Sequence, residues 1–132
     1  MDTNVLIDVF GADQNFGELS SDALRRCRAE GSLVACEVVW AEVAGGFPAE
    51  AAAGDALRRL GVGFSPLDEE TALLAGRSWR TYRRRGGQRE RLVPDFLIGA
   101  HAASTADRLL TRDRGFYRRY FEDLPLIDPS VS

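Results

Sequence analysis

Four acidic residues occupy positions at which a metal site could form. Asp2 precedes the first apolar stretch, Asp95 opens a predicted helix, and Asp113 directly follows an apolar run. Glu42 lies inside a helical stretch between apolar neighbours, where a carboxylate needs a partner. If the four carboxylates converge, they repel one another unless a hard cation such as Mg²⁺ or Mn²⁺ binds between them.

The chemistry that such a site favours is hydrolysis of a phosphodiester bond. Divalent ions activate a water and, when two of them lie about 4 Å apart, stabilise the attacking and leaving oxygens. This reaction needs no serine, cysteine or histidine nucleophile, which suits a chain whose one histidine is His101. Two cysteines and one histidine also fall short of the roughly four ligands of a zinc site.

The same residues also have structural interpretations. Asp95 could serve only as a helix cap, and Asp113 could be a turn residue, because aspartate is favoured at both places. Glu37 is a rival to Glu42, and His101 on an apolar helix is more typical of packing than of catalysis. The pattern places acids near strand ends, but it does not establish that they converge.

Short apolar runs alternate with helical stretches along the whole chain. Strands are predicted at residues 32–36, 62–67, 108–111 and 124–127, and helices at 4–10, 21–30, 37–44, 48–60, 68–85, 94–106 and 114–121. This alternation predicts an α/β fold with a central, mostly parallel sheet of four to five short strands. Ligands of such folds bind beyond the carboxyl ends of the strands, which is where the acids stand.

The composition is that of a single folded domain. The chain has 132 residues, is 45% hydrophobic and 28% charged, and carries a net charge of -3, which fits one domain over residues 1–132. No apolar run reaches the roughly 18 residues of a membrane span, and no basic-then-apolar leader is present. We therefore expect a cytoplasmic protein in which Cys27 and Cys36 are reduced.

All 17 basic residues are arginine, and most of them are clustered. Seven lie within residues 77–91, and four more flank Asp113. Guanidinium groups contact phosphates bidentately, so the clusters predict a surface that follows a nucleic-acid backbone. The candidate contact residues are Arg85, Arg89, Arg91, Arg112 and Arg114. The alternative is a solvated helix end whose positive charge matches the helix dipole.

Four segments resemble the motifs of PIN domains, in particular those of the VapC toxins of VapBC toxin–antitoxin pairs. Residues 2–8, Asp-Thr-Asn-Val-Leu-Ile-Asp, resemble the opening motif, and Glu42 fits the glutamate of the helix after the second apolar strand. Residues 94–102 are similar to the D-x-x-I-A-A-x-A helix, and residues 109–116 to the final T-x-D-x-x-F segment. The four motifs occur in the family's order and span nearly the whole chain.

The resemblance implies a Mg²⁺- or Mn²⁺-dependent ribonuclease with an α/β/α sandwich. It implies that the metal-binding, catalytic acids are Asp2, Glu42, Asp95 and Asp113. Asn4 and Thr111 would orient a carboxylate, a water or a phosphate. The partners that the resemblance implies are an RNA substrate, a cognate antitoxin and a second copy of the toxin in a homodimer.

The chain departs from the family pattern at its start and after its last motif. Only Met1 precedes Asp2, whereas relatives carry several apolar residues there, so we expect a truncated first strand or residues missing before Met1. The further acid that some relatives carry after the last aspartate is absent. We therefore expect one tightly bound ion, with a second ion arriving with RNA.

Two other functions stay open from the sequence. A degenerate PIN domain could bind RNA or protein without catalysis. A haloacid-dehalogenase-like phosphatase would also use an early aspartate, but Asn4 stands where its second acid is needed.

Overall fold

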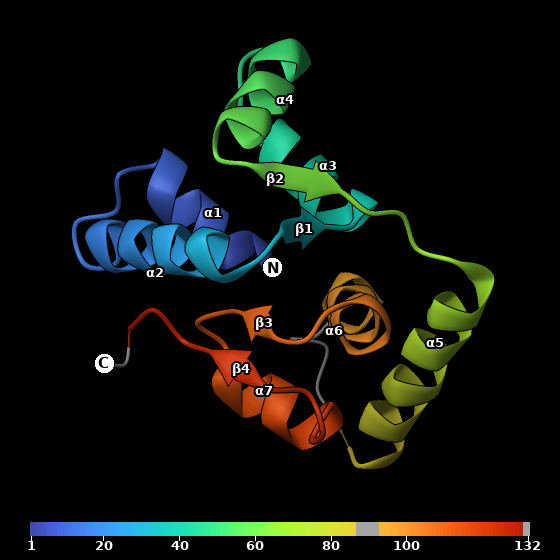
Figure 1. The fold of residues 1–132 in the computed structure, drawn as a ribbon. Helices are drawn as coiled ribbons and strands as arrows, with labels where there is room; N and C mark the ends of the chain where they lie inside the picture. The colour runs from blue at the N-terminus through green and yellow to red at the C-terminus, as the bar shows by residue number, and fades with distance from the viewer. Residues whose placement is uncertain (87–92, 131–132) are drawn as a thin grey trace.

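The computed structural model describes residues 1–86 and 93–130 and contains seven helices and four short strands in these ranges (Figure 1). The helices are α1 (Thr3–Phe10), α2 (Gly17–Glu30), α3 (Glu37–Gly45), α4 (Glu50–Arg59), α5 (Glu69–Arg84), α6 (Val93–Thr105) and α7 (Arg114–Tyr120). The strands are β1 (Leu33–Ala35), β2 (Val62–Phe64), β3 (Leu109–Leu110) and β4 (Leu126–Ile127). No helix of the described residues is long and apolar enough to cross a membrane.

Each predicted element is present in the predicted order, with shorter strands and an earlier start of α2. The carboxylate of Asp13 accepts hydrogen bonds from the amides of Asn15 and Phe16, at 2.9 Å each. This turn ends at Phe16, so the helix begins at Gly17 rather than at Ser21. Aspartate side chains stabilise turns by accepting hydrogen bonds from nearby backbone amides in this way.

The strands pair in parallel, as predicted, but they form two pairs instead of one continuous sheet. β1 pairs with β2 and β3 pairs with β4. Residues 1–2 lie between the pairs, where the Met1 ammonium is 3.4 Å from the carbonyl of Val34 and the Asp2 amide donates to the carbonyl of Leu110 at 2.9 Å. Two residues therefore take the place of a central strand.

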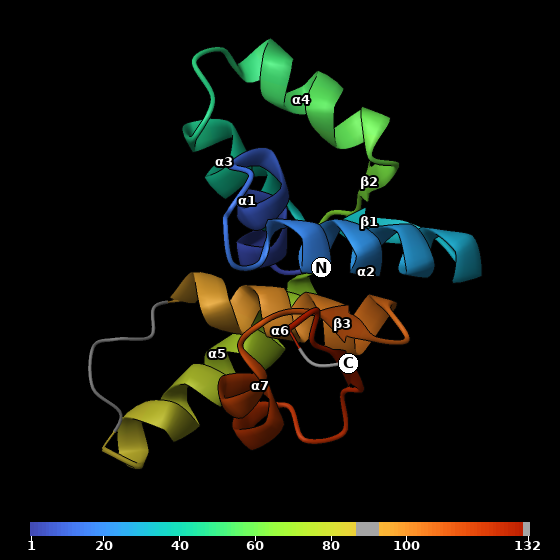
Figure 2. The same cartoon turned by 90° about the vertical axis from the view of Figure 1, so that its left-hand side faces the viewer.

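The molecule consists of two halves that meet at the amino terminus (Figures 1 and 2). The amino-terminal half holds α1 to α4 with β1 and β2, and the carboxy-terminal half holds α5 to α7 with β3 and β4. Both views place the N-terminus between β1 and β3. We refer to the boundary between the halves as the junction.

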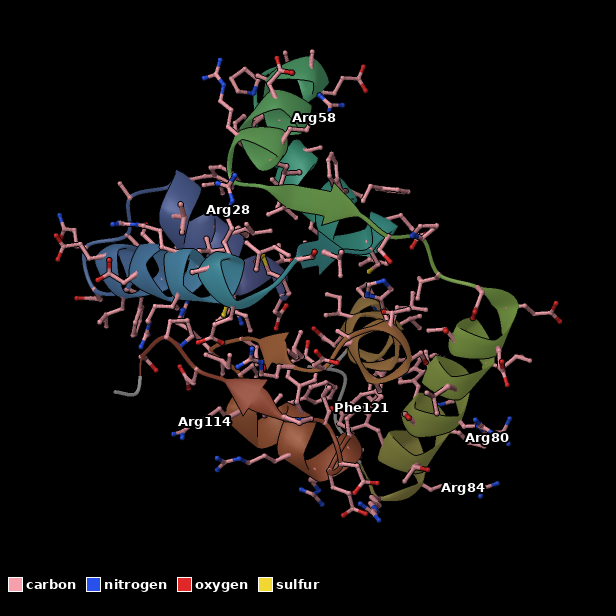
Figure 3. The ribbon with its side chains drawn as sticks, viewed as in Figure 1. Arg28, Arg58, Arg80, Arg84, Arg114 and Phe121 are labelled. Carbon is pink, nitrogen blue, oxygen red and sulfur yellow. The ribbon has the colours of Figure 1, made fainter. Side chains whose placement is uncertain are left out.

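Helix α6 lies against the junction and is mostly buried. It packs along α5 and also against α3, and Phe96, Ile98 and Ala100 on it are almost fully enclosed. A Cβ on Gly99 would collide with the ring of Phe121, which lies inside the carboxy-terminal half (Figure 3). Glycine at this position therefore lets α6 approach the segment after α7, and α6 carries Asp95 in its first turn.

Helix α5 has acidic residues at its start and basic residues at its end, as predicted. The carboxylate of Asp68 caps it by accepting from the amide of Thr71 at 2.8 Å. Glu69 and Glu70 lie in the first turn, and Arg83 lies in the last turn. This order of charges is favourable in the field of the helix dipole.

Candidate metal centre

Asp2 is the centre of a buried hydrogen-bond network at the start of α1. Asp2 is 7% exposed. The oxygen Oδ1 accepts from the amide of Thr3 at 2.7 Å. The other oxygen, Oδ2, accepts from the hydroxyl of Thr111 at 2.7 Å, from that of Tyr117 at 3.1 Å and from the amide group of Asn4 at 3.3 Å.

These donors fix the orientation of the carboxylate. They come from α1, from the residue after β3 and from α7. Three of them share Oδ2, so Oδ1 keeps more free acceptor capacity than Oδ2. In known metal sites, hydrogen-bond donors next to a carboxylate ligand hold that carboxylate in one orientation, and the donors around Asp2 can do the same.

Thr111 connects Asp2 with Asp113. Its side chain is fully buried, and its hydroxyl oxygen accepts from the Asp113 amide at 3.0 Å while it donates to Asp2. Asp113 is the residue before α7, but its side chain forms no cap hydrogen bond there. The turn is therefore stabilised by Thr111, and the carboxylate of Asp113 is not used as a helix cap.

Glu42, rather than Glu37, is connected with Asp2. The hydroxyl of Thr3 donates to Oε1 of Glu42 at 2.8 Å, and the amide of Thr3 donates to Asp2. The carboxylate of Glu37 instead accepts from the amide of Leu67 at 2.9 Å. Glu37 therefore has a structural role, and Glu42 is the acid of α3 that faces the network.

Asp95 lies in the first turn of α6 and is half-buried. Its charge acts on Tyr117, because burial first and then the charges of Asp2, Asp95 and Asp113 raise the pKa of the Tyr117 hydroxyl far above its usual value. The charges of three of the four predicted acids thus act on one hydroxyl group. The same effect keeps Tyr117 protonated, so it is a hydrogen-bond donor at any ordinary pH.

Sequence reasoning missed Tyr117 and Thr3 as members of this network. Tyr117 follows Asp113 by four residues, which is about one helical turn, and helical side chains lean towards the N-terminus. That spacing is the signal that could have identified Tyr117. Thr3 carried no comparable signal, because its hydroxyl partner Glu42 is 39 positions away.

The oxygen donors of the network suit a hard divalent ion, although they form no closed cage. Within residues 1–86 and 93–130, no three His, Cys, Asp or Glu side chains are close enough together to hold a metal ion. Mg²⁺ needs few protein ligands, because it keeps several waters and is commonly bound by one or two carboxylates together with substrate phosphate. The donor chemistry therefore fits such an ion, and waters would complete its coordination.

The arginines predicted to contact RNA differ in their surroundings. Arg112 pairs with Asp8, and Arg114 pairs with Asp128 at 3.0 Å. Arg85 is exposed after the end of α5, where Figure 3 shows Arg80 and Arg84 pointing into solvent. The remaining two candidates, Arg89 and Arg91, lie outside the described residues.

His101 lies on α6 and contacts the other half of the molecule. It is 3% exposed, and its Nε2 is 3.0 Å from the hydroxyl of Ser65. Burial, followed by the positive charge of the amino terminus, lowers its pKa, which Ser65 and Glu37 partly oppose. These surroundings are those of a packed histidine.

The junction has two ends. The acidic end contains Asp2, Thr111 and Tyr117, at the carboxyl ends of β1 and β3. The cavity end lies at the amino ends of the same strands and holds a cavity of about 290 Å³ beside Met1 and Arg108. The Met1 ammonium is buried there, and this burial lowers its pKa.

A family model for the PIN domain matches residues 1–122 of the chain. The chain belongs to the PIN domain family. PIN domains are generally nucleases and typically depend on a divalent metal. A search of curated proteins finds no significant match.

Two solved structures share the PIN fold with this chain. A chain of VapBC2 from Rickettsia felis, bound to a DNA fragment from its promoter, matches with a TM-score of 0.74 and 16% identity over 96% of this chain and 95% of that chain. A chain of VapBC-1 from nontypeable Haemophilus influenzae matches with a TM-score of 0.73 and 22% identity over 98% and 96%. The predicted α/β fold class and PIN resemblance are thereby confirmed.

Proposed function

We propose that this PIN domain is an endoribonuclease that depends on Mg²⁺ or Mn²⁺. The observation that supports the proposal is the network at the acidic end of the junction, which links Asp2 to Glu42 through Thr3 and to Asp113 through Thr111. The acids that we propose bind the metal are Asp2, Glu42, Asp95 and Asp113. A metal site of carboxylates requires local acidity of this kind, and it explains why a chain rich in arginine still has a net charge of -3.

The four acids would hold one or two ions, and each has a distinct support. Bound Mg²⁺ or Mn²⁺ would supply a Lewis acid that polarises the phosphate and acidifies a water. Thr111, Asn4 and Tyr117 keep the carboxylate of Asp2 in one orientation. Thr111 also fixes the backbone of Asp113, so that these two acids move together.

A role as the toxin of a toxin–antitoxin pair is the biological part of the proposal. Its support is the fold, which covers nearly all of the matched chains of two VapBC structures. We propose a cognate antitoxin as the regulatory partner, a homodimer as the assembly and the cytoplasm as the location. Growth arrest on expression, relieved by co-expression of a small neighbouring reading frame, is the expected result.

A PIN module that binds without catalysis is the second candidate. The absence of a closed set of three ligands among the described residues favours it. Calorimetric titration with Mn²⁺ separates the two functions, because the nuclease should bind the ion and the module should not. The phosphatase that the sequence left open belongs to another family and finds no support in a PIN domain.

The nuclease proposal is tested with Asp95→Asn. Asp95 is half-buried at a helix start, so the amide should leave the unfolding free energy nearly unchanged while Mn²⁺-dependent cleavage of RNA falls at least about 100-fold. Asp107→Asn is the matched control, because Asp107 is an exposed acid at the cavity end. Full activity of Asp95→Asn would refute the assignment.

Asp2→Asn is a less selective test of the same proposal. Asp2 accepts four hydrogen bonds, and an amide nitrogen cannot accept. The variant should therefore lose stability together with cleavage, so loss of activity there has two explanations.

A further inference from the structure

Arg112 lies between the two site residues Thr111 and Asp113, but its side chain leaves the acidic end. Its Nε donates to Oδ2 of Asp8 at 2.5 Å and its Nη2 donates to Oδ1 at 2.9 Å. This is a two-pronged contact across 104 positions of sequence. The Asp8 side chain is 4% exposed and that of Arg112 is 26% exposed.

The pair is enclosed by the hairpin of α1 and α2. The hydroxyl of Ser20 donates to Oδ2 of Asp8 at 2.9 Å, and the guanidinium of Arg112 lies 4.2 Å from the centre of the Phe16 ring. Two hydrogen bonds, a buried carboxylate and an aromatic face fix the guanidinium. The two N–H groups that bind Asp8 are therefore available to a phosphate only if Asp8 is displaced.

The backbone around Arg112 is attached to the start of α1. The Arg112 amide donates to Oδ1 of Asn4 at 3.3 Å. The neighbouring hydroxyl of Thr111 donates to Asp2 and accepts from the amide of Asp113. The segment 111–113 is thus bound to the first residues of the helix.

The Asp8 pair adds a second attachment further along the same helix. Asp8 follows Asp2 by six residues, which is about 9 Å at the α-helical rise per residue. Two attachments at that separation fix the direction of the segment as well as its position. A single attachment at Asp2 would allow the segment to pivot and Asp113 to move.

We infer that the Asp8–Arg112 pair is a positioning device that holds Asp113 against Asp2, and that Arg112 is not an RNA phosphate contact. The inference rests on the proposed function for its consequence in catalysis. It replaces the prediction that Arg112 binds RNA. Asp8 is thereby given a role although it is not one of the four acids.

Two single variants and their combination test the inference. Asp8→Asn keeps the shape of the side chain and removes its charge, and Arg112→Lys keeps the charge and removes the planar fork. Each should weaken Mn²⁺ binding about 10-fold, as loss of a residue that supports a metal ligand does, and lower kcat with little change in KM for an RNA oligonucleotide. The double variant should be no weaker than the worse single variant.

The control is Arg108→Gln, which breaks a pair between the same two halves at the other end of the junction. Arg108 donates to Glu30 at 2.8 Å, and both side chains are about half exposed. This variant should leave Mn²⁺ binding, kcat and KM unchanged. A loss of metal binding in Arg108→Gln equal to that in Asp8→Asn would overturn the inference, because the junction as a whole, and not the Asp8–Arg112 pair, would then position Asp113.

A phosphate contact at Arg112 predicts different results. Asp8→Asn would then release the guanidinium and leave Mn²⁺ binding unchanged, with KM equal or lower, while Arg112→Lys would bind RNA nearly as before. Either result overturns the inference and leaves the nuclease proposal standing. Full Mn²⁺ affinity in Asp8→Asn alone is sufficient to overturn it.

Amide hydrogen exchange gives a readout that needs neither metal nor RNA. In Asp8→Asn the amides of Arg112 and Asp113 should exchange at least about 10-fold faster, while amides of α4 stay unchanged. Unchanged exchange at those two amides overturns the inference even if the protein cleaves no RNA. Absence of cleavage by the unaltered protein, with faster exchange in the variant, instead refutes only the proposed function.

Discussion

The two ends of the junction join the same halves of the molecule with opposite chemistry. At the acidic end, buried polar groups from α1, β3 and α7 meet in a network around Asp2. At the cavity end, the same halves are connected by the exposed pair Arg108–Glu30 beside a cavity of about 290 Å³. Around Asp2 one end is buried and hydrogen-bonded, and the other end contains a cavity.

This difference indicates which end of the junction fixes the positions of the two halves relative to each other. Exposed ion pairs contribute about 0–1 kcal/mol and tolerate movement of both partners. Buried polar networks cost free energy when any member is missing, so they define one arrangement. The arrangement defined here is that of the candidate metal ligands, which the cavity end does not constrain.

The largest effect is expected from Thr111→Val, which removes the hydroxyl that joins Asp2 with Asp113. The variant leaves a buried carboxylate and a backbone amide without this partner, so the unfolding free energy should fall by about 3 kcal/mol in urea denaturation. Ser32→Ala, which removes an exposed hydroxyl at the cavity end, is the control and should change the unfolding free energy by less than about 0.5 kcal/mol. Equal losses in the two variants would remove the distinction between the ends.

A smaller effect is expected from Tyr117→Phe, which deletes one donor to Asp2 and keeps the ring. Loss of a hydrogen bond to a charged group should lower the unfolding free energy by about 1.5 kcal/mol. Mn²⁺ binding should also weaken about 10-fold, since Asp2 loses part of its support. Tyr120→Phe, whose half-buried ring packs against Phe116, should alter neither quantity. Undiminished Mn²⁺ affinity in Tyr117→Phe would mean that the hydroxyl only stabilises the fold.

The smallest effect concerns pH and His101, which contacts Ser65 between the two ends. Because burial lowers its pKa in the folded protein, the unfolded chain takes up a proton first as pH falls below about 6.5. The unfolding free energy should therefore decline between pH 6.5 and 5, by at most about 1.4 kcal/mol per pH unit. His101→Gln should flatten this decline in thermal or urea unfolding. An identical slope in both proteins would contradict the assignment of the pH dependence to His101.

The sequence predicted the order of the elements well and their lengths less well. Alternating apolar runs and helical stretches identify an α/β chain because burial of both sheet faces leaves that pattern. The strand predicted at 62–67 ends at Phe64, because Pro66 has no amide hydrogen to donate to a neighbouring strand and the amide of Leu67 binds the side chain of Glu37. The effect of the proline is a local signal, whereas the Glu37 contact depends on tertiary packing, which no local pattern encodes.

The same limit applies to the site. The acids could be found because they stand beside apolar stretches in the order of the PIN motifs, and Asn4 and Thr111 came from the same motifs, but the other supporting residues could not be found. Asp8 and Arg112 lie 104 positions apart, and within its own segment Arg112 is simply one arginine among several. Its partner becomes visible only when α1 and the segment after β3 are brought together.

The absence of lysine has a practical use. Every basic side chain of the 132 residues is a guanidinium, so amine-reactive reagents modify none of the side chains on which the acidic end and the Asp8–Arg112 pair depend. Two lysines introduced at exposed positions, one on each half, would therefore be the only pair of side chains that an amine-reactive crosslinker joins. The yield of that crosslink, followed by mass spectrometry, would report the separation of the two halves.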